Sequence, residues 1–171
     1  MQSILLLSPM QSISDTAPDV ARELGIQVEI KDSDDASVER HIQEYPDAEV
    51  VVTRGGFAER AKRVPGITVV EIAMSLNELL SNLSTLTGKG FSRIGIVSHP
   101  NLFSGAAGNF NILDAQVSIR PQESEEAIAA MVRQMADEGF QAFLGCRVAF
   151  NTARGLGLEA VFLESGKTSL R

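Results

Sequence analysis

Short runs of aliphatic and β-branched residues alternate along this chain with longer segments in which apolar residues recur every three to four positions. The short runs are typical of buried strands, and the longer segments are typical of helices with one apolar face. Their alternation predicts βαβ units around parallel sheets, so the predicted fold class is α/β. The predicted strands span residues 4–7, 27–31, 50–53, 68–72, 93–98, 116–120, 142–145 and 160–163.

Helices are predicted between these strands from residues that start and stop helices. The clearest begins with the capping box Ser75-Leu76-Asn77-Glu78 and continues with an apolar face, which includes Leu76, up to Gly88. Another spans residues 123–138, with acidic residues in its first turn and a glycine after its end. The others span residues 15–24, 38–45 and 57–63.

The order of the elements repeats at an offset of about 90 residues, which indicates an internal duplication. The strand at 4–8 aligns with 94–98, 28–30 with 118–120, 51–53 with 143–145, and 69–72 with 161–164. We therefore expect two similar three-layer α/β/α lobes with four-stranded parallel sheets. The first lobe would span residues 1–90 and the second 91–164. Residues 165–171 would start a helix that leads to an effector domain and that can pack on the first lobe.

Composition and charge exclude several classes of function. The 171 residues carry 15 Lys and Arg against 22 Asp and Glu, a formal net charge of -7. Nucleic-acid binding depends on clustered cationic side chains, so we expect no direct nucleic-acid contact. A single cysteine excludes an internal disulfide, and one cysteine with His41 and His99 cannot build a Cys/His zinc site. We expect no metal and no cofactor.

The first residues contain a run of four apolar side chains and no basic cluster. This is too little for a signal peptide or a membrane span. The sequence therefore predicts a cytoplasmic protein without a membrane partner.

Ligands of open parallel sheets bind beyond the carboxyl ends of the strands, so the expected site is a cleft between the two lobes. Thr53-Arg54-Gly55-Gly56 leaves a strand and enters a helix, where backbone amides can approach an anion and Arg54 can fork a carboxylate. The alternative is a glycine turn with a solvated Arg54. Ser75 can contact a ligand, cap its helix, or do both. The predicted ligand-binding residues are Arg54, Gly55, Gly56, Ser75, Ser8, Asn101, Arg147 and Ser165.

Cys146 follows the seventh predicted strand, where a nucleophilic thiolate would be well placed and where Arg147 would lower its pKa. A two-cysteine racemase needs one thiol on each face of its substrate, however, and the first half of the chain has none. No catalytic residue is therefore predicted. His41 lies among charged residues of a predicted helix and is expected to face solvent.

The segments 51–58, 65–72 with Ser75, 93–97 and 161–166 resemble, in this order, the N-terminal domain of the propionate catabolism activator family. The Arg-Gly-Gly start of a helix and the Ser-Gly ending are the most specific parts of the resemblance. It implies a bilobal, chelatase-like sensor at the head of sigma-54-dependent transcription activators. In that family a small metabolite relieves inhibition of downstream AAA+ and DNA-binding modules, and members named for propionate respond to the tricarboxylate 2-methylcitrate.

These observations together predict a ligand-sensing domain of a transcriptional regulator, with no enzymatic activity of its own. Its expected partners are a small organic acid, the downstream effector domains of the same polypeptide and, as one option, a second copy in a homodimer. Two alternatives stay open. One is a racemase or isomerase-like enzyme that uses Cys146, and the other is a dimerisation or interaction module with a vestigial cleft.

Overall fold

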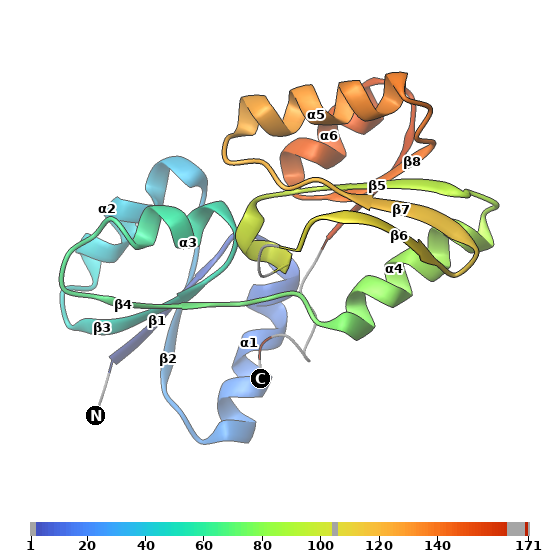
Figure 1. The fold of residues 1–171 in the computed structure, drawn as a ribbon. Coiled ribbons are helices and arrows are strands. Elements are labelled where there is room, and N and C mark those ends of the chain that lie inside the picture. Colours follow the sequence, from blue (N-terminus) through green and yellow to red (C-terminus); the bar gives the residue numbers. More distant parts are fainter. Residues whose placement is uncertain (1–2, 104–105, 164–169, 171) are drawn as a thin grey trace. The chain divides into compact units, whose positions relative to one another are not determined.

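The computed structural model describes residues 3–103, 106–163 and 170, and its chain divides into two compact α/β units (Figure 1). The first unit is formed by residues 1–75 and 164–171, and the second by residues 76–163. The division falls just before helix α4 (Leu76–Gly88), whereas the sequence placed it near residue 90. The capping box marks where this helix starts, but packing decides which unit it joins.

The first unit is a four-stranded parallel sheet in the order β2-β1-β3-β4 with helices on both faces. Its elements are β1 (Ser3–Ser8), α1 (Gln11–Leu24), β2 (Val28–Asp32), the short helix η1 (Asp35–Ser37), α2 (Val38–Glu44), β3 (Ala48–Thr53), α3 (Gly56–Ala61) and β4 (Thr68–Glu71). Successive side chains of a strand point to opposite faces. Accordingly, Leu5 and Leu7 of β1 pack with α2 and α3, while Leu6 packs with α1 and with Leu170.

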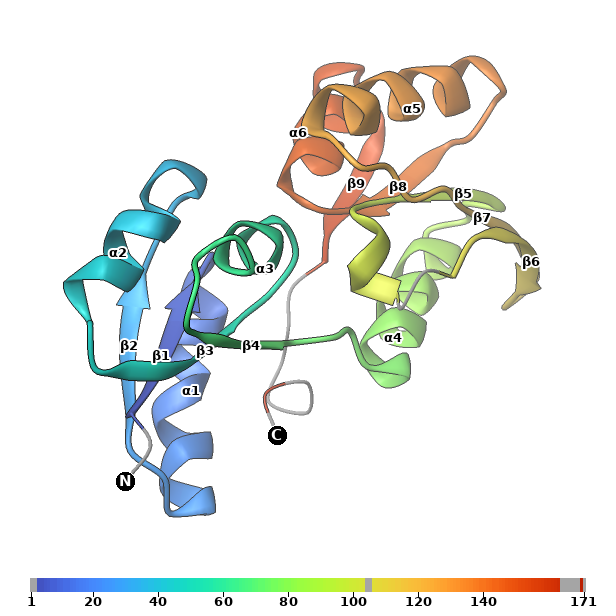
Figure 2. The same cartoon turned by 60° about the vertical axis from the view of Figure 1, so that its left-hand side comes forward.

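The second unit contains a five-stranded sheet in the order β6-β7-β5-β8-β9. Its elements after α4 are β5 (Arg93–Val97), η2 (Pro100–Phe103), β6 (Gly108–Ile112), β7 (Ala115–Ile119), α5 (Glu125–Asp137), β8 (Ala142–Gly145), α6 (Arg147–Gly155) and β9 (Glu159–Phe162). Helices α5 and α6 cover one face and α4 covers the other (Figures 1 and 2). Both units are therefore three-layered.

The strand order agrees with the repeat found in the sequence. Strands β1, β2, β3 and β4 of the first unit take the same positions in their sheet as β5, β7, β8 and β9 in the second. These are the pairs that align at an offset of about 90 residues, so the internal duplication is visible in the topology.

Three expectations from the sequence were wrong. The second sheet has five strands because β6 pairs antiparallel with β7. The short alternation of polar and apolar residues in its sequence Gly-Asn-Phe-Asn-Ile was not recognised as a strand. Helix α6 was not predicted; it has nine residues, and two of its four apolar residues are alanines. Leu76 was expected on the buried face of α4 but is 68% exposed at the helix start. Among the described residues, no helix has the length and apolarity needed to cross a membrane.

Candidate functional site

The carboxyl end of the first sheet has a topological switch point between β1 and β3. The chain leaves β1 for β2 on one side and then crosses to β3 on the other, so the connections diverge between the two strands. Such points are where open parallel sheets bind ligands. The strand ends are also held together, since the buried Thr53 hydroxyl donates to the Leu7 carbonyl at 2.7 Å.

Ser8 ends β1 and is 1% exposed. Its hydroxyl donates to the carbonyl of Met10 at 2.7 Å and accepts a 3.4 Å hydrogen bond from the Met10 amide. This pair of bonds shapes the turn that leads from β1 into α1. The structure thus gives Ser8, a predicted ligand residue, a role in placing the first turn of α1.

The first turn of α1 faces the same edge of the sheet and lacks the groups that usually cap a helix. Its N-cap residue, Met10, has no capping side chain, and the turn contains no acidic residue. The hydroxyl of Ser12 is buried and has no hydrogen-bond partner among the described residues. A buried unsatisfied hydroxyl costs about 1–3 kcal/mol, and a helix N-terminus favours negative charge. Sequence reasoning missed Ser12 because it started this helix at residue 15.

Arg54 follows β3, the neighbour of β1, and is only 5% exposed. The alternative of a solvated Arg54 is therefore wrong. A guanidinium offers five N–H donors, and a buried one is paired within the fold, as Arg54 is. With that many donors it can keep a structural partner and also hold a carboxylate.

The turn after Arg54 depends on a glycine. Gly55 has φ 57° and ψ -135°, a conformation that side-chain-bearing residues rarely adopt. Its carbonyl accepts from the amides of Ala58 and Glu59 at 3.0 and 3.4 Å, which starts α3 at Gly56. The predicted glycine turn between β3 and α3 is therefore present, although Arg54 is not solvated.

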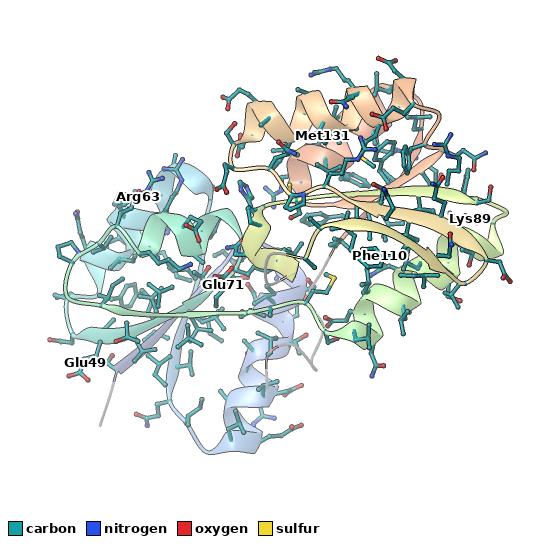
Figure 3. All side chains as sticks on the ribbon, in the orientation of Figure 1. Glu49, Arg63, Glu71, Lys89, Phe110 and Met131 are labelled. Atoms are coloured by element: carbon teal, nitrogen blue, oxygen red, sulfur yellow. The ribbon has the colours of Figure 1, made fainter. Side chains whose placement is uncertain are left out.

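Strand β4 adds a carboxylate to this edge, next to β3. Glu71 accepts a 3.2 Å hydrogen bond from Lys62 through Oε2, while its Oε1 is buried without a partner among the described residues. Figure 3 marks Glu71 on this strand. Lys62 also donates to Glu59 at 2.7 Å, and this bond, followed by the one to Glu71, raises the Lys62 pKa. Glu71 Oε1 can accept a hydrogen bond from a ligand hydroxyl.

His41 was expected to face solvent and is instead buried, with 7% exposure. Its Nε2 lies 3.3 Å from the Arg40 guanidinium, and its Nδ1 lies 2.8 Å from the Ser33 hydroxyl. Because a guanidinium can only donate, Nε2 accepts and the ring carries its proton on Nδ1. His41 thus ties the loop after β2 to α2, and the sequence pattern of charged neighbours concealed this.

The equivalent edge of the second unit has different chemistry. Cys146 caps α6 and is half-buried, and burial raises the pKa of its thiol against the opposing effect of hydrogen bonds with Ala149, Val148 and Ser98. The expectation that Arg147 would lower this pKa was therefore wrong, and the Arg147 side chain is exposed. A thiol with a raised pKa is a poor nucleophile at neutral pH.

The predicted ligand residues fall into three groups. Ser8, Arg54, Gly55 and Gly56 lie at the carboxyl edge of the first sheet, and the half-buried Ser75 ends the same unit. Asn101 in η2 and Arg147 in α6 belong to the second unit. Ser165 lies outside the described residues. In the part of the chain that the structure describes, no cluster of three His, Cys, Asp or Glu side chains could hold a metal ion.

Comparison with known proteins gives a family and a fold. The sequence model of the propionate catabolism activator family matches residues 18–171. An NtrC family transcriptional regulator from Clostridium acetobutylicum is similar in structure, with a TM-score of 0.79, 15% sequence identity, and coverage of 99% of this chain and 91% of that one. At that identity the likeness shows the fold alone.

A solute-binding protein of an ABC transporter from Agrobacterium vitis, solved with alpha-D-tagatopyranose, has a TM-score of 0.44 at 11% identity over 95% of this chain and 76% of that one. This similarity is too low to support an argument. No curated protein matches the sequence significantly.

Proposed function

This chain belongs to the propionate catabolism activator family of regulatory sensor domains, and we propose that it senses a small organic anion bound at the carboxyl edge of its first sheet. The observation that carries the proposal is Arg54, an arginine that is only 5% exposed and lies at the topological switch point. Charge-assisted hydrogen bonds are stronger than neutral ones, and salt screens buried charges less than exposed ones. A cation placed in this way favours a carboxylate over neutral metabolites.

Three polar groups at the carboxyl edge of the first sheet suggest the class of acid. Arg54 would hold one carboxylate by two parallel N–H bonds, and the first turn of α1 with the Ser12 hydroxyl would hold a second. Glu71 Oε1 would accept from a hydroxyl of the ligand. We therefore favour a hydroxylated di- or tricarboxylate. The 2-methylcitrate implied by the family resemblance has this chemistry.

The proposal assigns no chemical step to the domain. A bound acid would act by stabilising one conformation of the sensor, and it can shift the attached effector only by its difference in affinity for the two conformations. The raised pKa of Cys146 supports this interpretation over a thiol-dependent racemase. The effector domains of the same polypeptide are proposed as the partner that reads the change.

The test is isothermal titration calorimetry of the 171-residue chain with a panel of small hydroxylated and non-hydroxylated carboxylates that includes 2-methylcitrate. Arg54→Lys keeps the charge and removes the fork, so we expect affinity to fall by about tenfold or more. Arg63→Lys, at an exposed arginine of the same unit, is the matched control and should bind as the wild type does (Figure 3). Equal affinity of Arg54→Lys and wild type would remove Arg54 from the site.

A further inference from the structure

Strand β6 is an open edge of the second sheet. Within the sheet that the structure describes, β6 pairs with β7 alone (Figure 2). Residues 108–111 are all exposed. In an antiparallel pair, alternate residues direct their backbone N–H and C=O to the neighbouring strand, and the residues between them direct theirs outward. β6 therefore presents unpaired backbone groups to its surroundings, and it has no counterpart in the described part of the first unit.

The other sheet edges carry charge and β6 does not. Of the four edge strands, β2 contains Glu29, Lys31 and Asp32, β4 contains Glu71, and β9 contains Glu159. Charged side chains on an edge strand prevent pairing with another chain. The sequence Gly-Asn-Phe-Asn-Ile of β6 lacks this protection, and no charged residue occurs in the whole stretch 100–113.

The hairpin that carries β6 also exposes two large apolar side chains. Phe110 is 41% exposed on the strand (Figure 3), and Leu113 is 49% exposed in the turn to β7. Leu113 and Asp114 have φ values of 52° and 61°, which fit the two-residue turn that best matches the twist of a hairpin. Left-handed φ values in residues other than glycine cost about 1–3 kcal/mol each and persist only where the surrounding structure enforces them. This turn sets the register in which β6 pairs with β7.

We infer that β6 pairs antiparallel with β6 of a second copy of this chain, so that one sheet continues through a homodimer. A two-fold axis near Phe110 sets Asn109 of one copy opposite Asn111 of the other. An asparagine amide both donates and accepts, so this pairing is self-complementary, and the two Phe110 rings add apolar contact.

The size of the edge sets the strength of this contact. Pairing along a five-residue strand buries far less than the roughly 1,200–2,000 Å² of a standard stable interface. We therefore expect a concentration-dependent equilibrium between monomer and dimer. This dimer is independent of the proposed anion site, because β6 and Arg54 belong to different units.

Analytical ultracentrifugation of the 171-residue chain, from low into high micromolar concentration, tests the inference. The wild type should shift from monomer to dimer over this range. The double variant Asn109→Lys/Asn111→Lys places lysines opposite lysines, so association should weaken by about tenfold or more. Its glutamate counterpart, Asn109→Glu/Asn111→Glu, should behave in the same way.

An equimolar mixture of the lysine and glutamate variants places opposite charges across the axis and should restore the dimer. Thr68→Lys on the exposed edge of β4 is the control, and it should dimerise as the wild type does. Circular dichroism of each variant verifies the fold. The inference is overturned if the wild type stays monomeric throughout, which would leave β6 to a different partner, or if the lysine variant dimerises as well as the wild type.

Discussion

The turns after β3 and β8 occupy the same position in the two units and hold opposite arrangements of charge. After β3, Arg54 is buried and is followed by a glycine with positive φ. After β8, Gly145 leads to the half-buried thiol of Cys146 and then to the exposed Arg147. Beside these turns, β1 ends in the buried Ser8, and the buried Ser98 follows β5. The duplicated topology therefore fixes where the turns lie, while the burial of one cation decides which edge is suited to an anion.

The glycines of the two turns serve different purposes, and alanine substitutions should separate them. A Cβ at residue 145 would lie 2.2 Å from the Val97 carbonyl oxygen and 2.5 Å from the Ala149 Cβ. Overpacking against rigid backbone should make Gly145→Ala lose about 3 kcal/mol or more of unfolding free energy. Gly55→Ala meets no atom within 4 Å but has a positive φ, so its loss should be about 1–3 kcal/mol.

Urea unfolding of both glycine variants measures the difference. A Gly145→Ala variant as stable as the wild type would show that the turn after β8 is not close-packed.

Replacing Arg54 should lower the unfolding free energy more than replacing Arg147, because Arg54 is buried and Arg147 is exposed. Removing the buried guanidinium in Arg54→Ala leaves its partner groups unsatisfied, and we expect a loss of about 2 kcal/mol or more. Arg147→Ala changes an exposed side chain and should stay within about 0.5 kcal/mol of the wild type. Thermal and urea unfolding of the two variants without ligand give the comparison. If both variants lost the same unfolding free energy, Arg54 would not be a buried charge that stabilises the first unit.

Cys146 should react slowly with thiol reagents. Burial raises its pKa, so the thiolate fraction near neutral pH is small and the rate of alkylation should rise only at more alkaline pH. We expect iodoacetamide to modify the folded chain at least about tenfold more slowly than the urea-unfolded chain, as followed by mass spectrometry. A rate in the folded state that exceeds the unfolded rate would revive the enzyme alternative for the second unit.

The ion pairs of the two units should affect stability at opposite ends of the pH scale. Hydrogen bonds from Arg120 at 2.6 and 2.9 Å lower the pKa of Glu138 from 4.5 to about 2. The contribution of ionised Glu138 to the free energy of unfolding is present above pH 4.5 and is lost as the pH falls toward 2. In the first unit, Glu59 and Glu71 raise the pKa of Lys62. The contribution of protonated Lys62 to the free energy of unfolding is present below pH 10.5, the ordinary pKa of lysine, and is lost at higher pH.

Both effects on stability are small, because all four side chains keep contact with solvent, which weakens an ion pair. Melting temperatures from pH 2 to 11 for Glu138→Gln and Lys62→Gln check them. The first variant should flatten the acid side of the profile and the second the alkaline side. The reverse pattern would contradict the assigned partners.

The sequence predicted the strands and the repeat because buried parallel strands are apolar runs of regular spacing, as in β1, β5 and β8. It did not predict β6, whose alternation of polar and apolar residues covers only Asn109 to Ile112 and contains two asparagines, which are uncommon in strands. It located Arg54 at a strand end, but burial depends on packing against other elements and has no local signature. The same limit explains why His41 was placed in solvent and why Ser12 was missed.

The most direct test of the account compares, in ligand binding, the arginines that lie in the two equivalent turns. Calorimetry with the tightest-binding acid of the panel would be run on the wild type, Arg54→Lys and Arg147→Lys under identical conditions. The account predicts a loss of about tenfold or more for Arg54→Lys and a change within about twofold for Arg147→Lys. Binding that depends on Arg147 and is indifferent to Arg54 would contradict it and move the anion site to the second unit.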